Sequence, residues 1–64
     1  MLLWFTEART QNKMAINPEY VVAVFTSNEG DFSGKTVISV TNGQVAIEEE
    51  ILETIGRING EMLP

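Results

Sequence analysis

The chain has 64 residues, a formal net charge of −5 at pH 7 and a sequence pI near 4.3, and it contains no cysteine and no histidine. This composition excludes disulfide bonds, thiolate zinc sites and histidine-based catalysis, and its four scattered basic residues form no patch for direct contact with nucleic acid. A hydrophobic content of 44% is sufficient for a globular core, so we expect one small domain over residues 1–64.

Three strands are predicted in the first half of the chain, over residues 2–6, 13–17 and 20–26. The first holds Leu, Trp and Phe in succession, so both of its faces would be apolar. One helix cannot cover both faces, so this strand either curls across the core or presents its outer face to another subunit. The Asn17-Pro18 pair marks a turn before the third strand, whose run of β-formers predicts a central strand buried on both faces.

Residues 27–34 form the longest irregular stretch and lead into a Gly-Lys-Thr sequence that invites comparison with phosphate-binding loops. The spacing between Gly30 and Gly34 is one residue short of that motif, and a strand rather than a helix follows Thr36. We therefore interpret the stretch as a hairpin loop in which the two glycines supply positive φ and Phe32 folds back over the sheet edge.

An Asn42-Gly43 pair between two alternating apolar runs predicts a β-hairpin with strands at residues 36–41 and 44–47. A type I′ turn at this pair would place Val40 opposite Val45 and put the large aliphatic side chains of both strands on one face. That face would form the core surface, and the opposite face would be half-polar.

The hydrophobic period changes from two to about 3.6 at Glu48, which predicts a helix over residues 48–58. The Asn59-Gly60 pair is expected to end this helix, because glycine is the usual residue after the last helical turn. The apolar stripe of the helix consists of Ile51, Ile55 and Ile58.

The start of this helix is acidic. Glu48, Glu49 and Glu50 would lie in its first turn, where the helix dipole favours carboxylates. Glu53 can form an ion pair with Arg57, one turn further along the helix.

Together these elements predict the α+β class, with a small, mostly antiparallel four-stranded sheet and one C-terminal α-helix packed on one face. No arrangement of residues predicts catalysis or a metal site. Paired carboxylates in an enclosed cleft are missing, and residues 28–31 are too short for a calcium loop. We expect no enzyme activity and no cofactor.

The candidate interaction residues are Leu2 and Trp4 on the first strand, and Glu49 and Glu53 on the acidic helix. A chain this small, without disulfides or metal, often relies on association for stability, so we expect a homo-oligomer. The mildly basic residues 1–17 and the acidic end could meet head to tail between subunits. No basic region precedes the apolar start, which fits neither a signal peptide nor a membrane span, so we expect a cytoplasmic protein.

A set of residues that covers most of the chain fits the pattern of a known family: Thr6, Arg9, Asn12-Lys13, Ile16-Asn17-Pro18-Glu19 followed by Val21 or Val22, Thr36 to Gly43, and Val45 to Glu48. With these residues, the order of elements resembles that of the small FlbD-type proteins associated with bacterial flagella and swarming. The resemblance transfers no catalytic residue, and it implies a motility accessory protein that acts by contact with other proteins.

The sequence therefore favours a non-catalytic protein–protein interaction or assembly module with an unknown protein partner. The alternative is a small acidic phage or mobile-element protein that inhibits a nucleic-acid-handling host protein through a carboxylate-rich surface. A carboxylate mimic should lose its partner steeply as salt rises, whereas a contact through Leu2 and Trp4 should hardly change.

Overall fold

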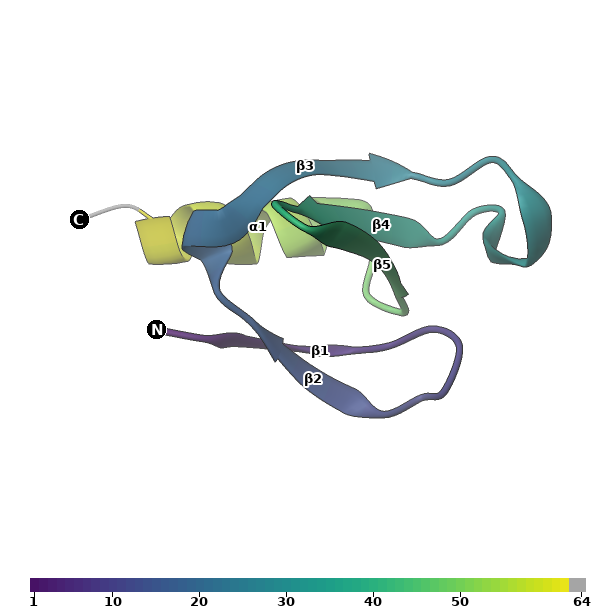
Figure 1. Ribbon diagram of the computed structural model, residues 1–64. Helices are drawn as coiled ribbons and strands as arrows, with labels where there is room; N and C mark the ends of the chain where they lie inside the picture. The colour runs from purple at the N-terminus through teal and green to yellow at the C-terminus, as the bar shows by residue number, and fades with distance from the viewer. Residues whose placement is uncertain (63–64) are drawn as a thin grey trace.

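The computed structural model describes residues 1–62, and the side chains of residues 1–60. Two antiparallel sheets and one helix make up the fold (Figure 1). The first sheet pairs β1 (Leu3–Thr6) with β2 (Lys13–Ile16). The second sheet has the order β3 (Val21–Thr26), β4 (Thr36–Val40), β5 (Gly43–Ile47). The helical elements are the short 3-10 turns η1 (Pro18–Tyr20) and η2 (Gly30–Phe32), and the helix α1 (Ile51–Met62).

The α+β class is confirmed, but the single four-stranded sheet expected from the sequence is wrong. The chain leaves the first sheet at η1, where Pro18 has no N–H for a ladder and the side chain of Asn17 accepts the N–H of Glu19 at 3.0 Å. Among the described residues, the one backbone bridge between the two sheets is an isolated antiparallel bridge between Glu7 and Ile47. The strands therefore divide into one pair and one group of three.

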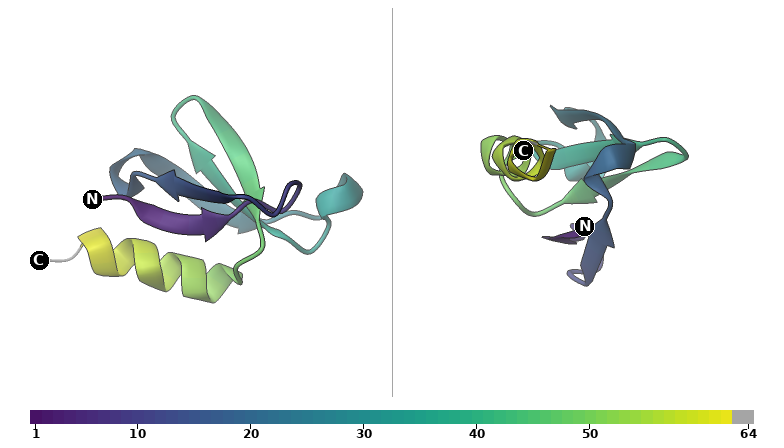
Figure 2. Two further views of the ribbon diagram at one scale, coloured as in Figure 1. Left: turned by 90° about the horizontal axis from the view of Figure 1, so that it is seen from below. Right: turned by 90° about the vertical axis from the view of Figure 1, so that its left-hand side faces the viewer.

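The β1–β2 hairpin lies as a second layer against the three-stranded sheet, and α1 runs along one side of both layers (Figure 2). The first strand contributes Leu3 and Phe5 to the core. Its alternate residues point inward because successive side chains of a strand face opposite sides. The buried core cluster consists of Leu3, Phe5, Ile38, Ile47 and Ile58.

The β4–β5 hairpin differs from the expected register by two residues. Val40 lies opposite Gly43 rather than Val45, and Thr41 and Asn42 form the turn. Neither Asn42 nor Gly43 has positive φ, so the turn is not of type I′. A shift of two residues preserves the alternation of side chains, so the large aliphatic residues still share one face.

Helix α1 begins and ends later than expected, at Ile51–Met62 instead of residues 48–58. Glu48 and Glu49 form a bend, Glu50 is the last residue before the helix, and Gly60 lies within the last helical turn instead of ending it. Along residues 1–62 the fold contains no helix that is both long enough and apolar enough to cross a membrane.

The apolar stripe of α1 faces the core as predicted. Ile58 is buried, and Ile51 and Ile55 are half-buried. Thr54 is fully buried between them, and its hydroxyl donates to the carbonyl of Glu50 at 2.9 Å, which satisfies its polar group.

The loop between β3 and β4 follows the interpretation made from the sequence. Gly30 and Gly34 both have positive φ, at 62° and 88°. Phe32 is half-buried, and the guanidinium of Arg9 lies 5.7 Å from the centroid of its ring. The Gly-Lys-Thr sequence leads into strand β4, so no helix N-terminus is available for a phosphate.

Candidate interaction site

Two exposed apolar side chains lie on β1 and just before it. Leu2 is 54% exposed and Trp4 is 61% exposed, whereas Leu3 and Phe5 between and beyond them are buried. Trp4 lies opposite Ala15 on β2, and the small alanine leaves the indole uncovered. The first strand thus presents a large apolar surface away from the core, as its sequence predicts.

Arg57 of α1 fixes the backbone of β1 beneath this surface. Its Nη2 donates to the carbonyl oxygen of Trp4 at 2.6 Å, and its guanidinium carbon lies 4.4 Å from the centroid of the Phe5 ring. The expected ion pair between Glu53 and Arg57 is wrong, because the only ion pair among the described side chains joins Lys35 to Glu48. The guanidinium instead holds the strand to the helix.

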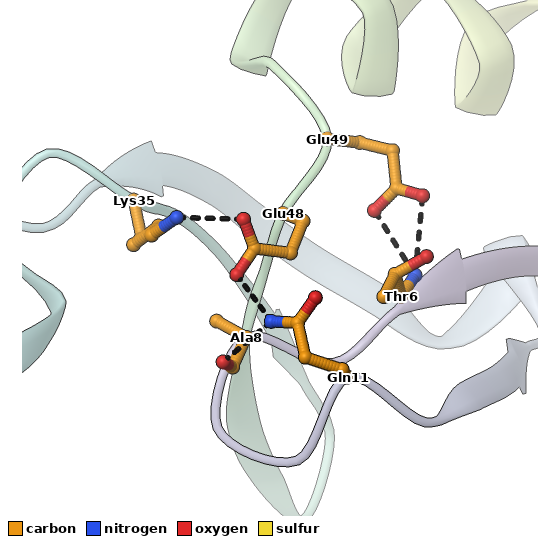
Figure 3. Close-up of polar contacts among 6 residues, drawn as sticks. All are labelled: Thr6, Ala8, Gln11, Lys35, Glu48 and Glu49. Atoms are coloured by element: carbon orange, nitrogen blue, oxygen red, sulfur yellow. Dashed lines mark hydrogen bonds and ion pairs between the residues drawn. The ribbon is translucent and has the colours of Figure 1, made fainter.

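Glu49 is bound within the fold. Both of its carboxylate oxygens accept the backbone N–H of Thr6, at 3.0 and 3.1 Å, while the N–H of Glu48 donates to the carbonyl of Thr6 at 2.9 Å (Figure 3). The carboxylate thereby satisfies a strand edge that no other strand covers at this point. Of the two acidic residues proposed for interaction, Glu49 is half-buried and Glu53 is exposed.

Glu48 links three segments of the chain (Figure 3). It accepts the ammonium of Lys35 at 2.6 Å and the side-chain amide of Gln11 at 2.7 Å. These two contacts, that with Lys35 first, hold the pKa of Glu48 below its ordinary value. Lys35, the lysine of the Gly-Lys-Thr sequence, therefore forms an ion pair with a carboxylate of the protein itself.

Strand β3 departs most from the sequence interpretation. The sequence predicts a buried central strand, yet β3 lies at the edge of its sheet, and Tyr20, Val22 and Phe25 at or beside it are exposed. Val22 is the extra residue of a β-bulge between Val21 and Ala23, which turns its side chain outward. The uninterrupted apolar run in the sequence does not indicate that Val22 is exposed. A bulge interrupts the alternation of side chains from which the buried and the exposed face of a strand are predicted.

A shallow groove of about 530 Å³ crosses the outer face of the three-stranded sheet. Its apolar lining includes Phe25, Phe32 and Val37, and Arg9 and Glu29 line it as well. Among the residues that the structure describes, no group of three or more His, Cys, Asp or Glu is placed to hold a metal ion. The groove brings together an apolar floor and opposite charges, an arrangement suited to contact with a partner.

Leu2 and Trp4 are thus exposed at alternate positions, and Glu49 fastens the end of the same strand through the backbone N–H of Thr6. Leu52, on α1, is also exposed and lies at the margin of the buried helical stripe. No family model, no curated protein and no solved structure matches the chain. The resemblance to FlbD-type proteins therefore stays a prediction.

Proposed function

We propose that this protein is a non-catalytic interaction and assembly module that forms homo-oligomers through the outer face of β1. The observation that carries the proposal is the exposure of Leu2 and Trp4 on a strand whose alternate residues already fill the core. Tryptophan is enriched at protein interfaces because it buries a large apolar area with few rotatable bonds. A strand with two apolar faces is stabilised when a second molecule covers the outer one.

The charges near this surface support a second copy as the occupant. Arg9 and Lys13 lie in or beside the β1–β2 hairpin and form no ion pair among the described side chains, whereas Glu50 and Glu53 are exposed at the start of α1. A basic hairpin on one subunit and an acidic helix start on another are complementary, so charge would orient the contact that Trp4 anchors.

The process that fits the resemblance is bacterial motility, in which this module would act in the cytoplasm as an accessory protein by contact with other proteins. The acidic inhibitor remains the second candidate, but the structure favours it less. Glu48 and Glu49 are engaged in internal contacts, which leaves Glu50 and Glu53 as the exposed part of the proposed carboxylate surface.

Sedimentation equilibrium at low and high salt tests the proposal. Self-association anchored by Trp4 should persist at high salt, because burial of apolar surface is not screened. Association that disappears as salt rises would contradict the apolar contact and support an interaction through carboxylates. Glu50→Gln with Glu53→Gln provides the matched variant, which should weaken the association only modestly.

A further inference from the structure

The outer edge of β3 is the longest strand edge without a backbone partner in residues 1–62. β3 spans six residues and pairs only with β4. It forms the upper border of the molecule in Figure 1. A row of unpaired N–H and C=O groups on such an edge is a template for one further strand.

The hydrogen bonds at the end of β3 identify the outward backbone groups. The N–H of Ser27 donates to the carbonyl of Lys35 at 2.9 Å, one step beyond the pair of Thr26 with Thr36. Because backbone groups of successive residues point to opposite sides of a strand, Thr26 directs its N–H and C=O away from β4, and so does Val24. No hydrogen bond among the described residues reaches these groups from the outer side.

The other strand edges are protected. The side chains of Arg57 and Glu49 cap the edge of β1, and the N–H of Ala8 donates to the carbonyl of Ala46 on β5 at 2.9 Å. β2 has only four residues and begins with Lys13. β3 contains no charged residue and no proline; a bulge interrupts its start, and, in the described part of the chain, α1 packs against it without a backbone hydrogen bond to its outer edge.

The residues that flank β3 indicate what it binds. Glu19 lies just before the strand, and Glu29 and Asp31 lie just after it. All three are exposed, and their carboxylates form no hydrogen bond or ion pair with any side chain or backbone group that the structure describes. Along the chain, β3 is therefore flanked by one exposed carboxylate before it and two in the loop that follows it, with the exposed Val22 and Phe25 in the strand itself.

We infer that β3 binds an extended segment of another protein, with uncharged β-forming residues at its centre and lysine or arginine at both ends. A second copy of this chain does not fit this edge. Antiparallel pairing of two β3 strands would bring Glu19 of one copy near Glu29 of the other, and like charges repel. This inference rests on the proposed interaction function but uses a different surface from the one centred on Trp4.

A designed peptide tests the inference. It has alternating valine and threonine at its centre and lysines at both ends. A second peptide has glutamates at the ends, and a third keeps the lysines but has N-methylated backbone amides on the edge that would pair. Calorimetric titration of the native chain should show binding of the first peptide only, because pairing needs both the backbone donors and the basic ends.

Two double variants of the protein distinguish a local effect of the carboxylates that flank β3 from a general effect of the net charge of the protein. Glu19→Gln with Glu29→Gln should weaken binding of the lysine peptide by about three- to tenfold. Glu50→Gln with Glu53→Gln changes the net charge equally and should leave the affinity within about twofold, since Glu50 and Glu53 lie before and in α1 rather than beside β3. Equal losses in both double variants would overturn the assigned location.

Amide hydrogen exchange locates the contact on the unmodified protein. The lysine peptide should slow exchange at Val24 and Thr26 and leave Phe25, whose N–H already faces β4, unchanged. Equal binding of the N-methylated peptide, or no binding of the lysine peptide, would overturn the inference. Protection of Val24 and Thr26 that grows with protein concentration in the absence of peptide would also overturn it, because a second copy would then be the occupant.

The Trp4→Ala variant keeps this test distinct from the test of the proposed function. It should bind the lysine peptide as the native chain does, whether or not it still self-associates. Loss of peptide binding in this variant would place the peptide on β1 and contradict the assignment to β3.

Discussion

Both carboxylate oxygens of Glu49 accept the backbone N–H of Thr6, at 3.0 and 3.1 Å, across 43 positions of the sequence. The contact fastens the end of β1 to the segment that precedes α1, and the N–H of Glu48 reinforces it through the carbonyl of Thr6. A strand edge is thus covered by a side chain where a neighbouring strand would otherwise lie. The surface that carries Trp4 is held in place by this contact and by Arg57.

Removal of this carboxylate should destabilise the fold. We expect Glu49→Ala to lower the free energy of unfolding by about 1–3 kcal/mol, because the half-buried N–H of Thr6 loses its acceptor. Glu49→Gln, which keeps one acceptor oxygen, should lose less. Urea denaturation measures both variants. The exposed Glu53→Ala should change the free energy by less than about 0.5 kcal/mol, and an equal loss there would show that the contact has no specific role.

Glu48 should make the free energy of unfolding depend on pH under acidic conditions. Its pKa in the folded state lies below the ordinary value of 4.5, chiefly because of Lys35 and then Gln11. The stabilisation is therefore complete above pH 4.5 and is lost as pH falls through the lower folded pKa, since the unfolded state takes up the proton first. The free energies of unfolding of the native chain and of Glu48→Gln, measured as a function of pH, should converge as pH falls through this range. Curves that stay parallel would contradict the assignment.

The two loop glycines with positive φ should resist substitution, whereas the hairpin glycine should accept it. Gly34→Ala places a Cβ at φ +88° and should cost about 1–2 kcal/mol. Gly43 has no positive φ and open space around a Cβ, so Gly43→Ala should be nearly neutral. Thermal unfolding of the two variants gives the comparison. A type I′ turn at Asn42-Gly43 would instead make Gly43→Ala costly.

Alanine in the helix should stabilise the protein. Gly56 is exposed within α1, and the methyl group of an alanine there would meet no neighbouring atom, so Gly56→Ala should raise the free energy of unfolding by about 0.8–1 kcal/mol. Gly60→Ala should give a smaller gain, because the last turn frays. Calorimetry measures both. A loss of stability at Gly60 would indicate that this glycine ends the helix, contrary to its position in α1.

The elements that depend on local pattern are predictable from the sequence. The stripe of Ile51, Ile55 and Ile58 follows from helical periodicity, and the common face of the β4–β5 hairpin survives a shift in register because side chains alternate every residue. The loop glycines are identifiable because positive φ selects for glycine.

The features that sequence reasoning misses arise from contacts between distant segments. Nothing near Glu49 in the sequence indicates Thr6 as its partner. The argument from the helix dipole predicts Glu49 in the first helical turn, but the helix begins two residues later, at Ile51. The run of β-forming residues over 20–26 predicts a central strand, yet the chain forms two sheets and leaves β3 at an edge. The exposure of Leu2 and Trp4 follows from the sequence, because large apolar residues at successive positions of a strand cannot all face one core.

Light scattering across a wide range of concentrations tests the central claim most directly. The native chain should show a mass above that of the monomer, and Trp4→Ala should remain monomeric at concentrations where the native chain associates. Leu52→Ala, which removes an apolar side chain of greater exposure from α1, should associate like the native chain. A monomer at every concentration, or association that Trp4→Ala leaves intact, would contradict an assembly module built on the outer face of β1.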